Sequence, residues 1–203
     1  MAWVVDYFPT CLFHVFLSHS REDHDRLVRP VYDRLAENGI CAWIDRHHYP
    51  YGADSRSALQ QSLVKCRHTV FFVTEDMIAS PRGWCVLELA YTELLQRSVL
   101  APSGPLSNTF LPLFFVPQNH HLLPRTVWQA IRDRGNFHDT TKGLDPVTWA
   151  CMEIERFLKR EQRMTIGLKA RAGRDRTFRQ SLPLSTGLRD RVTKFDPQPI
   201  PEE

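Results

Sequence analysis

Apolar and polar residues alternate in short blocks along most of this chain. Five of the apolar blocks are short and rich in β-branched and aromatic side chains, a composition typical of buried strands. They span residues 12–18, 40–44, 69–73, 109–116 and 136–139. The last block is the shortest and the most polar of the five, so we expect it at the edge of a sheet.

The stretches between these strands have apolar residues three or four positions apart, the spacing of an amphipathic helix. The predicted helices span residues 23–37, 55–64, 81–97, 127–132 and 146–163. Asn38-Gly39 closes the first helix, and Ser80-Pro81 opens the third with Pro at its first position. Strands that alternate with helices through short loops form a parallel sheet covered on both faces. The pattern therefore predicts an α/β fold with a five-stranded parallel sheet.

Residues 1–163 are expected to form one domain, because 203 residues with 42% hydrophobic content can build one ordinary core. Beyond Arg163 the helical spacing is lost, and the composition becomes basic and proline-containing. Residues 164–203 are therefore expected to be an extension that is partly ordered or disordered, with room for one short helix.

The formal net charge of +3 is unevenly distributed. From Lys159 to Glu203 the chain has 11 Lys and Arg residues against 6 Asp and Glu residues, so the preceding body is close to neutral. A near-neutral body requires no acidic partner, and we expect no nucleic-acid ligand for it. A basic arm that contacts nucleic acid or a partner chain is the second interpretation of the extension.

Features of secretion and membrane insertion are missing from the sequence. No basic region precedes an apolar stretch at the N-terminus, and no apolar segment reaches transmembrane length. The five cysteines are scattered and odd in number, which fits reduced thiols better than a disulfide framework. We therefore expect a cytoplasmic protein without a membrane partner.

Glu88 is the only charged residue in the apolar run Trp84–Tyr91 of the third predicted helix. A carboxylate is costly to bury among such neighbours, and catalytic acids and bases are a common reason for doing so. Trp84 lies four residues earlier and shares a helix face with Glu88. For this residue alone, a glutamate that reaches solvent from a surface helix is the simpler interpretation.

Further polar residues follow the predicted strands. Ser18 ends the first strand, Asp45 follows the second, and the loop before Glu88 comes after the third. In a parallel sheet the carboxyl ends of the strands meet at one edge, where ligands bind at a switch in strand order. We therefore expect these residues to line one pocket.

Other groupings of polar residues have simpler explanations. Ser18-His19-Ser20 beside Asp23 suggests a nucleophilic triad, but neighbours on a strand end point in alternating directions. The histidine pairs at 47–48 and 120–121 lack suitably spaced Cys or carboxylate partners, so we predict exposed loop histidines and no metal site. Neither GxGxxG nor GxxxxGK[ST] occurs, so a bound dinucleotide coenzyme is not expected.

Five motifs occur in an order and with gaps that resemble the Toll/interleukin-1 receptor (TIR) domain family. They are FHVFLSHSRED (residues 13–23), GICAWID (39–45), HYPYGADSRSALQQSL (48–63), SPRGWCVLEL (80–89) and FLPLFFV (110–116). The resemblance covers residues from about 13 to about 157 and leaves the extension outside. It implies a flavodoxin-like sheet of five parallel strands with helices on both faces.

The resemblance also implies candidate site residues. Some TIR domains only assemble, whereas many bacterial, plant and axonal members cleave NAD⁺ between nicotinamide and ribose. Similarity to the bacterial enzymes implies that Glu88 is catalytic. It implies substrate-binding roles for Phe16, Ser18, His19, Asp45, Arg46, Tyr51, Gly52 and Trp84. NAD⁺ would then be a substrate, and no cofactor is expected.

The leading hypothesis is an NAD⁺ glycohydrolase or ADP-ribosyl cyclase of bacterial antiphage defence. A non-catalytic TIR adaptor that acts by self-association is the alternative, and a nucleoside-processing transferase of related architecture is a third hypothesis. The chain departs from the family pattern at His14, where Asp is commoner, and in the loop with His47-His48. The family resemblance implies self-association through TIR–TIR contacts, and we expect a separate sensor or effector protein.

Overall fold

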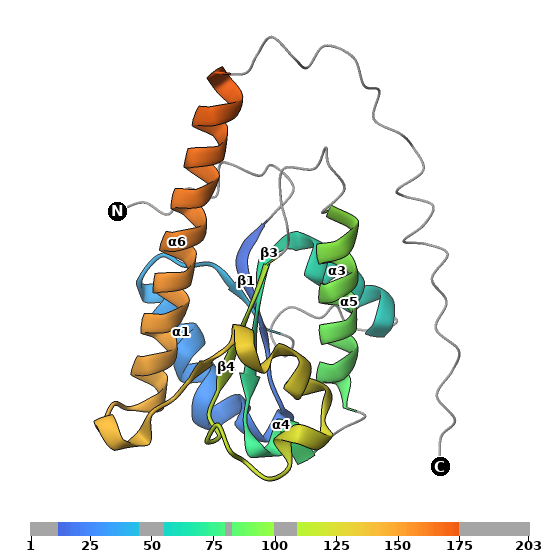
Figure 1. The fold of residues 1–203 in the computed structure, drawn as a ribbon, viewed down its shortest axis with the longest axis vertical. Coiled ribbons are helices and arrows are strands. Elements are labelled where there is room, and N and C mark those ends of the chain that lie inside the picture. The colour runs from blue at the N-terminus through green and yellow to red at the C-terminus, as the bar shows by residue number, and fades with distance from the viewer. Residues whose placement is uncertain (1–11, 45–54, 80–82, 100–108, 175–203) are drawn as a thin grey trace. The chain divides into compact units, whose positions relative to one another are not determined.

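The computed structural model of the chain describes residues 12–44, 55–79, 83–99 and 109–174 (Figure 1). Within these residues, five strands pair in the order β2-β1-β3-β4-β5, and every pair is parallel. The strands are β1 (Phe13–Ser18), β2 (Ala42–Trp43), β3 (Cys66–Val73), β4 (Thr109–Phe114) and β5 (Asn136–Phe137). The predicted α/β fold with a five-stranded parallel sheet is confirmed.

The strand order reverses at β1. Val15 of β1 pairs with Ala42 of β2 on one side and with His68 of β3 on the other. The chain thus runs outward from β1 to β2 and then returns to β3 on the opposite side. Ligands of open α/β sheets bind beyond the carboxyl ends of the strands at such a reversal. The residues that follow β1 and β3 are therefore placed where a site is expected.

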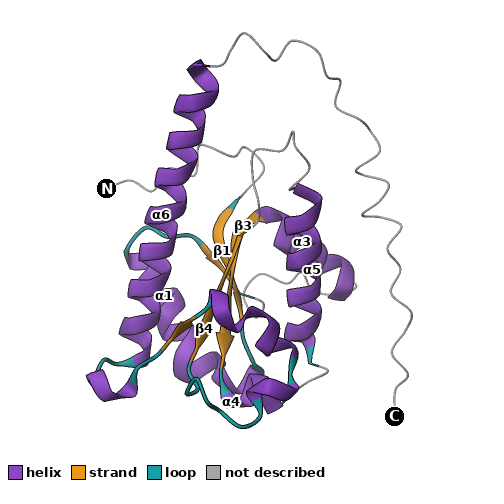
Figure 2. Ribbon diagram, viewed as in Figure 1, coloured by secondary structure: helices purple, strands orange, loops and turns teal. Residues whose placement is uncertain are grey.

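Helices cover both faces of the sheet (Figures 1 and 2). On one face lie α1 (Arg29–Glu37) and α6 (Pro146–Arg174), the latter through its residues 149–158. On the other face lie α3 (Ser55–Lys65), α4 (Glu75–Ala79) and α5 (Trp84–Val99). The connections on either side of β5 contain the short 3₁₀ helices η4 (Leu123–Arg125), η5 (Val127–Arg134) and η6 (Thr140–Lys142).

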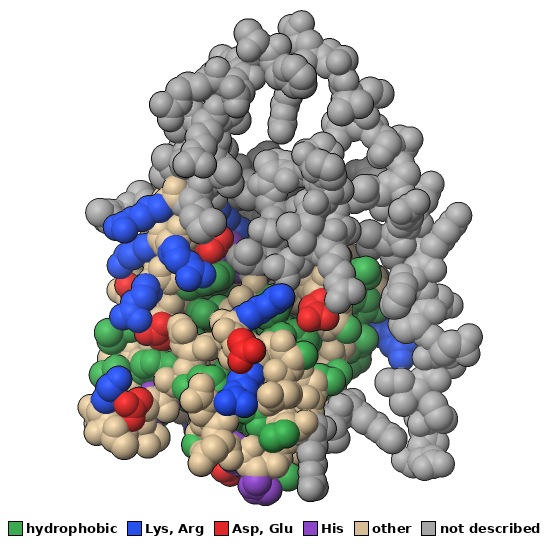
Figure 3. All heavy atoms as spheres, in the orientation of Figure 1, with side chains coloured by type: hydrophobic (Ala, Val, Ile, Leu, Met, Phe, Trp, Pro, Cys, Tyr) green, Lys and Arg blue, Asp and Glu red, His purple; other side chains and the backbone are tan. Residues whose placement is uncertain are grey.

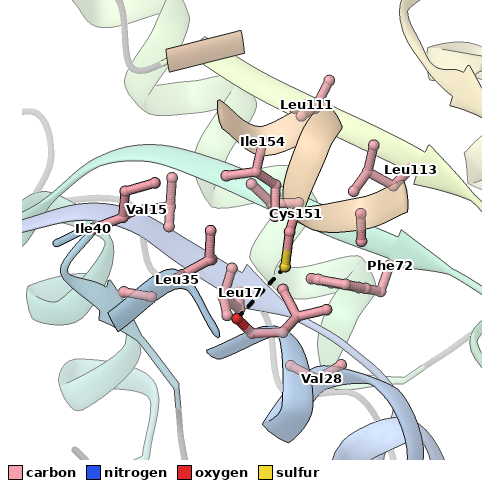
Figure 4. Close-up of a cluster of buried hydrophobic side chains, with 14 of the residues drawn as sticks. Val15, Leu17, Val28, Leu35, Ile40, Phe72, Leu111, Leu113, Cys151 and Ile154 are labelled. Atoms are coloured by element: carbon pink, nitrogen blue, oxygen red, sulfur yellow. Dashed lines mark hydrogen bonds between the residues drawn. The ribbon is translucent and has the colours of Figure 1, made fainter. Parts of the chain in front are cut away.

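The core beneath α1 and α6 is built from β-branched, leucine and aromatic side chains (Figure 4). Val15 and Leu17 of β1 belong to the same cluster as Ile154 of α6, and all three are buried. Cys151 lies among them, and its Sγ–H donates to the Val31 carbonyl over 3.9 Å. Burial raises the pKa of the Cys151 thiol to about 11, so this side chain stays neutral as part of the core.

The helix predicted for residues 23–37 begins irregularly. A 3₁₀ turn, η2 (Arg21–Asp23), and a π-helical turn, η3 (His24–Val28), precede α1, which starts at Arg29. Pro30 explains the irregularity, because its nitrogen cannot donate to the carbonyl four residues earlier. The predicted helix at 127–132 is likewise the 3₁₀ helix η5.

The helix that carries Glu88 starts later than predicted. It begins at Trp84, so Pro81 is not its first residue, and Ser80-Pro81 lies outside the described residues. Glu88 consequently lies in the second turn of α5. The sequence pattern also missed α4, because five residues are too few to show a helical period.

Helix α6 continues to Arg174, beyond the predicted end at 163. The chain is divided into two compact units, Met1–Arg160 and Glu161–Glu203. Lys and Arg side chains are visible along α6 in Figure 3. Arg156, Lys159 and Arg160 are among the exposed residues of this helix. None of the helices in the described part of the chain combines the length and the apolarity needed to cross a bilayer.

Candidate active site

Glu88 and Ser18 meet at the carboxyl edge of the sheet. Ser18 is the last residue of β1, and α5 returns against the strand direction, so its first turns lie at the same edge. The Glu88 side chain is only 4% exposed, and Ser18 Oγ–H donates a 2.5 Å hydrogen bond to Glu88 Oε2. A buried carboxylate is therefore held by a hydroxyl from 70 residues earlier in the chain.

A cavity of about 410 Å³ opens beside this pair. Its described walls come from the end of β1, the turn that follows, α4 and the start of α5. The lining residues are Phe16, Leu17, His19, Ser20, Arg21, Glu22, His24, Met77, Gly83, Trp84, Cys85 and Glu88. Ser18 is not among them, so its part in this site is to hold the Glu88 carboxylate.

The structure brings together five of the residues proposed from the sequence. Phe16, His19, Trp84 and Glu88 line the cavity, and Ser18 contacts Glu88. Phe16 is also stacked on Trp43, with ring centroids 4.5 Å apart. This contact holds the Phe16 ring in position at the edge of the sheet. The remaining candidates lie outside the described residues: Asp45, Arg46, Tyr51 and Gly52.

Asp23 holds the turn after β1 in place. Its carboxylate is fully buried and accepts hydrogen bonds from the hydroxyls of Ser20 and Thr74. Arg26 Nη2 donates to Asp23 Oδ1 over 2.6 Å and to Asp76 over 2.5 Å. The ends of β1 and β3 are thereby tied together. This arrangement gives Asp23 a structural role rather than that of a triad acid.

His19 and His24 form a second contact in the cavity wall. His19 Nδ1 lies 2.9 Å from the Leu17 carbonyl, and His19 Nε2 lies 3.0 Å from His24 Nδ1. Cys85 joins this group, because its Sγ–H donates to the His19 carbonyl over 3.1 Å.

The sequence proposed four of the twelve lining residues, and His24 and Cys85 are among the eight that it missed. Cys85 lies three positions before Glu88 and thus on the same helix face, a spacing that could have identified it. His24 offered no comparable signal, because it follows the strand by six residues in an irregular turn.

The walls combine apolar and ionisable groups. Phe16, Leu17, Met77 and Trp84 present apolar surface, while Glu88 supplies a carboxylate. Such a site can stabilise a positive charge that develops on a bound molecule, because the electrostatic attraction of a carboxylate is stronger where water is excluded.

In the described part of the chain, no three His, Cys, Asp or Glu side chains are grouped to hold a metal ion.

The family model described as the TIR domain matches residues 15–145 of the chain. This chain belongs to the TIR domain family. The matched segment runs from β1 to the residue before α6 and contains all nine site candidates proposed from the sequence, as well as the cavity.

Two curated relatives of this TIR domain are bacterial. It is 28% identical over 87 residues to the NAD(+) hydrolase TcpC of Escherichia coli O6:H1, covering 43% of this chain and 27% of that protein. It is 26% identical over 81 residues to the 2' cyclic ADP-D-ribose synthase BtTIR of Bacteroides thetaiotaomicron, covering 40% and 28%. The matches thus span little more than a quarter of either relative.

Among solved structures, the TIR domain resembles that of the Toll-related receptor TRR-2 from Hydra magnipapillata. The sequences are 14% identical and the TM-score is 0.46, with 72% of this chain and 98% of the other covered.

Proposed function

We propose that this TIR domain is an NAD⁺ nucleosidase that breaks the bond between nicotinamide and ribose. The observation that carries the proposal is the buried Glu88 carboxylate, which lines the cavity while Ser18 holds it in place. The distant relatives support the same chemistry, since one is named an NAD(+) hydrolase and another a cyclic ADP-ribose synthase.

One carboxylate is sufficient for this reaction. Most glycosidases need a second carboxyl group to protonate a poor leaving group. Nicotinamide, in contrast, is bound to ribose through a cationic pyridinium nitrogen and leaves as a neutral molecule without a proton. The remaining requirement is to stabilise positive charge on the ribose, and a preorganised carboxylate does this through its charge.

Three of the cavity residues then have defined tasks. Glu88 engages the ribose next to nicotinamide, and its two oxygens have enough lone pairs to accept from Ser18 and from a ribose hydroxyl together. Trp84 and Phe16 supply apolar walls for the rings of the substrate. We propose further contacts to ribose or phosphate from Asp45, Arg46, Tyr51 and Gly52, which are outside the described residues.

The molecule that attacks the ribose decides the product. Attack by water gives ADP-ribose, while attack by the adenine or the second ribose of the substrate gives a cyclic ADP-ribose isomer. Both reactions begin with the same release of nicotinamide. We propose that this release serves bacterial antiphage defence, that the domain self-associates, and that a separate protein senses the trigger or responds to the product.

The first prediction concerns Glu88. Glu88→Gln keeps the size of the side chain but removes its charge, so nicotinamide release should fall at least about a hundredfold. Release is measured by chromatography with mass detection of the products formed from NAD⁺ by concentrated protein. Glu93→Gln is the matched control, because Glu93 is on the same helix but does not line the cavity.

Equal loss of activity in both variants, or no loss in Glu88→Gln, would remove Glu88 from the mechanism. Thermal melting of each variant separates loss of the carboxylate from loss of the fold. A wild-type protein that assembles but releases no nicotinamide would support the adaptor hypothesis instead. Release of bases from free nucleosides would support the transferase.

A further inference from the structure

Two walls of the cavity come from segments that are far apart in the sequence. The turn after β1 contributes residues 19–22 and His24, and α4 contributes Met77. Neither segment holds its shape by itself, because the turn combines 3₁₀ and π-helical geometry and α4 has only five residues. Contacts with the rest of the fold therefore set the position of both walls.

Asp23 lies between these two walls and contacts both. Its side chain is 0% exposed, and each of its carboxylate oxygens accepts two hydrogen bonds. Oδ2 accepts from the hydroxyl of Ser20, which lines the cavity, and over 2.5 Å from that of Thr74. Oδ1 accepts from Nε and Nη2 of Arg26, over 3.1 Å and 2.6 Å. Groups of the protein therefore satisfy the whole carboxylate.

Thr74 extends this contact to α4. Besides donating to Asp23, its hydroxyl oxygen accepts from the backbone N–H of Met77 over 3.2 Å. The hydroxyl thus caps the N-terminus of α4, a role for which threonine is among the preferred residues. Arg26 adds a second link, because its Nη2 also donates to Asp76 of α4 over 2.5 Å. The first turn of this short helix is thereby joined to the buried carboxylate.

The charge on Asp23 allows one side chain to join these groups. An ionised carboxylate only accepts hydrogen bonds, and its two oxygens have enough lone pairs for both hydroxyls and the guanidinium together. An amide of the same size has one accepting oxygen and would place N–H donors against groups that already donate. Buried polar groups that lose their partners are costly. Removal of the charge should therefore release the turn and α4 from each other.

We propose that Asp23 is a positioning residue of the active site, which through Ser20 and Thr74 holds the turn and α4 in the arrangement that binds the substrate. Glu88 is held separately by Ser18, so the network acts on the walls of the cavity. The effect on the substrate rests on the proposed function, whereas the link between the walls does not depend on a ligand. Loss of the network should weaken substrate and transition-state binding alike, which raises KM and leaves kcat nearly unchanged.

The cysteines of the protein serve as reporters of the link. Cys85 is half-buried in the cavity wall, and its Sγ–H donates to the His19 carbonyl of the turn over 3.1 Å. Release of the turn removes this contact and exposes the thiol, whereas Cys151 in the core reacts only when the domain unfolds. Cys41 is exposed and gives the rate of an accessible thiol. Alkylation by iodoacetamide is followed by mass spectrometry of tryptic peptides, because trypsin places these three cysteines in different peptides.

Asp23→Asn should accelerate alkylation of Cys85 relative to Cys151 about tenfold, the equivalent of losing one hydrogen bond to a charged group. It should raise the KM of NAD⁺ by a similar factor and change kcat by less than about twofold. Thr74→Val removes the hydroxyl and should act in the same direction, while Thr74→Ser keeps the hydroxyl and should behave as the wild type. Melting temperatures show which variants fold, and the two Thr74 variants provide the test if Asp23→Asn does not.

Glu153→Gln is the matched control. Glu153 is also a buried carboxylate, and like Asp23 it accepts from an arginine three positions later, Arg156, and from a side chain of another element, Asn136. It joins α6 to β5 and does not line the cavity. Its replacement should lower the melting temperature but leave the KM of NAD⁺ and the relative alkylation rate of Cys85 at their wild-type values.

Alkylation of Cys85 at the wild-type rate in folded Asp23→Asn and Thr74→Val would overturn the inference, as would equal acceleration in the control. An unchanged KM in a variant whose turn has opened would also overturn it. So would a loss confined to kcat, because the network would then act on Glu88 rather than on the walls. A wild-type protein that releases no nicotinamide would refute the proposed function alone, since alkylation is measured without NAD⁺.

Discussion

Ser18 is the residue whose role depends most on a single contact. It is 1% exposed, and its hydroxyl donates to the Glu88 carboxylate within a largely apolar surrounding. Hydrogen bonds to charged groups are stronger than those between neutral groups, and an unpaired buried charge is costly. Ser18 therefore fixes the position of the carboxylate in the proposed mechanism.

Ser18→Ala should lower kcat/KM for nicotinamide release about ten- to a hundredfold, the equivalent of losing one hydrogen bond to a charged group. Steady-state kinetics with NAD⁺ provide the measurement. Ser62→Ala is the matched control, since Ser62 is also buried but donates to the Ala58 carbonyl of its own helix. If both variants lose activity to the same extent, the contact with Glu88 has no special role.

At the level of elements, the edge strands are short and depend on particular contacts. β2 contains two residues, and its attachment to β1 is extended by His14. The His14 backbone N–H donates to the Cys41 carbonyl, and the Cys41 N–H donates to His14 Nδ1, each over 2.8 Å. His14 is also one of the two places where the sequence departs from the family pattern. Because an imidazole can gain a proton, His14 gives β2 a link that depends on pH.

Acidification should weaken this link. Burial lowers the pKa of His14 below its ordinary value of 6.5, and the Arg67 guanidinium acts in the same direction. The unfolded chain therefore binds the proton more readily, so the stability contribution of neutral His14 is complete above about pH 6.5 and is lost as the pH falls. For one proton, the slope is at most about 1.4 kcal/mol per pH unit.

Urea unfolding at several pH values measures this slope for the wild type and for His14→Asn. The Asn side chain can accept from the Cys41 N–H but does not titrate, so its free energy of unfolding should fall less steeply with acid. Parallel curves for the two proteins would show that His14 is not responsible.

The edge strand β5 depends on close packing at Gly135. A Cβ atom at Gly135 would lie 2.3 Å from Cε2 of Phe114. Phe114 is fully buried in β4 and stacked on Phe137 of β5, with ring centroids 4.5 Å apart. The ring therefore has little room to move, and glycine is the residue that allows the chain to enter β5.

Gly135→Ala should lower the free energy of unfolding by about 1–3 kcal/mol, the usual cost of overpacking a core. Introducing Phe114→Leu together with it should recover part of that loss, because the smaller side chain relieves the overlap. Chemical denaturation of both single variants and the double variant gives the coupling energy. Strictly additive effects would contradict a direct clash.

For the whole molecule, the reversal of strand order brings distant segments to one edge. Ser18 ends β1, with Asp23 and His24 in the turn after it. Thr74 follows β3, and Glu88 lies on the helix that leads to β4. The loop at residues 45–54 follows β2 and is outside the described residues. We propose that self-association of the TIR domains raises the activity of each cavity.

Specific activity should therefore rise with protein concentration. A dilute monomer lacks whatever association contributes to the cavity, so it should be less active than the associated protein. Nicotinamide release per molecule, measured over a wide concentration range beside the oligomeric state by light scattering, tests this prediction. Constant specific activity across the range would mean that each cavity is complete without a neighbour.

The amino-acid sequence by itself determined the order of the strands and of the longer helices, because a strand buried on both faces needs a continuous apolar run and a helix needs an apolar stripe. It also placed Trp84 and Glu88 on one helix face, since side chains four positions apart on a helix are neighbours. These are local relations, and periodicity reveals them.

Only the tertiary structure decided which polar groups meet. The bonds from Ser18 to Glu88 and from Thr74 to Asp23 join residues on different elements, and no spacing in the sequence encodes them. The contact between His19 and His24 depends on an irregular turn that periodicity predicted as a regular helix. Side chains interact over a few ångströms, so their partners are set by how the chain folds back at the strand reversal.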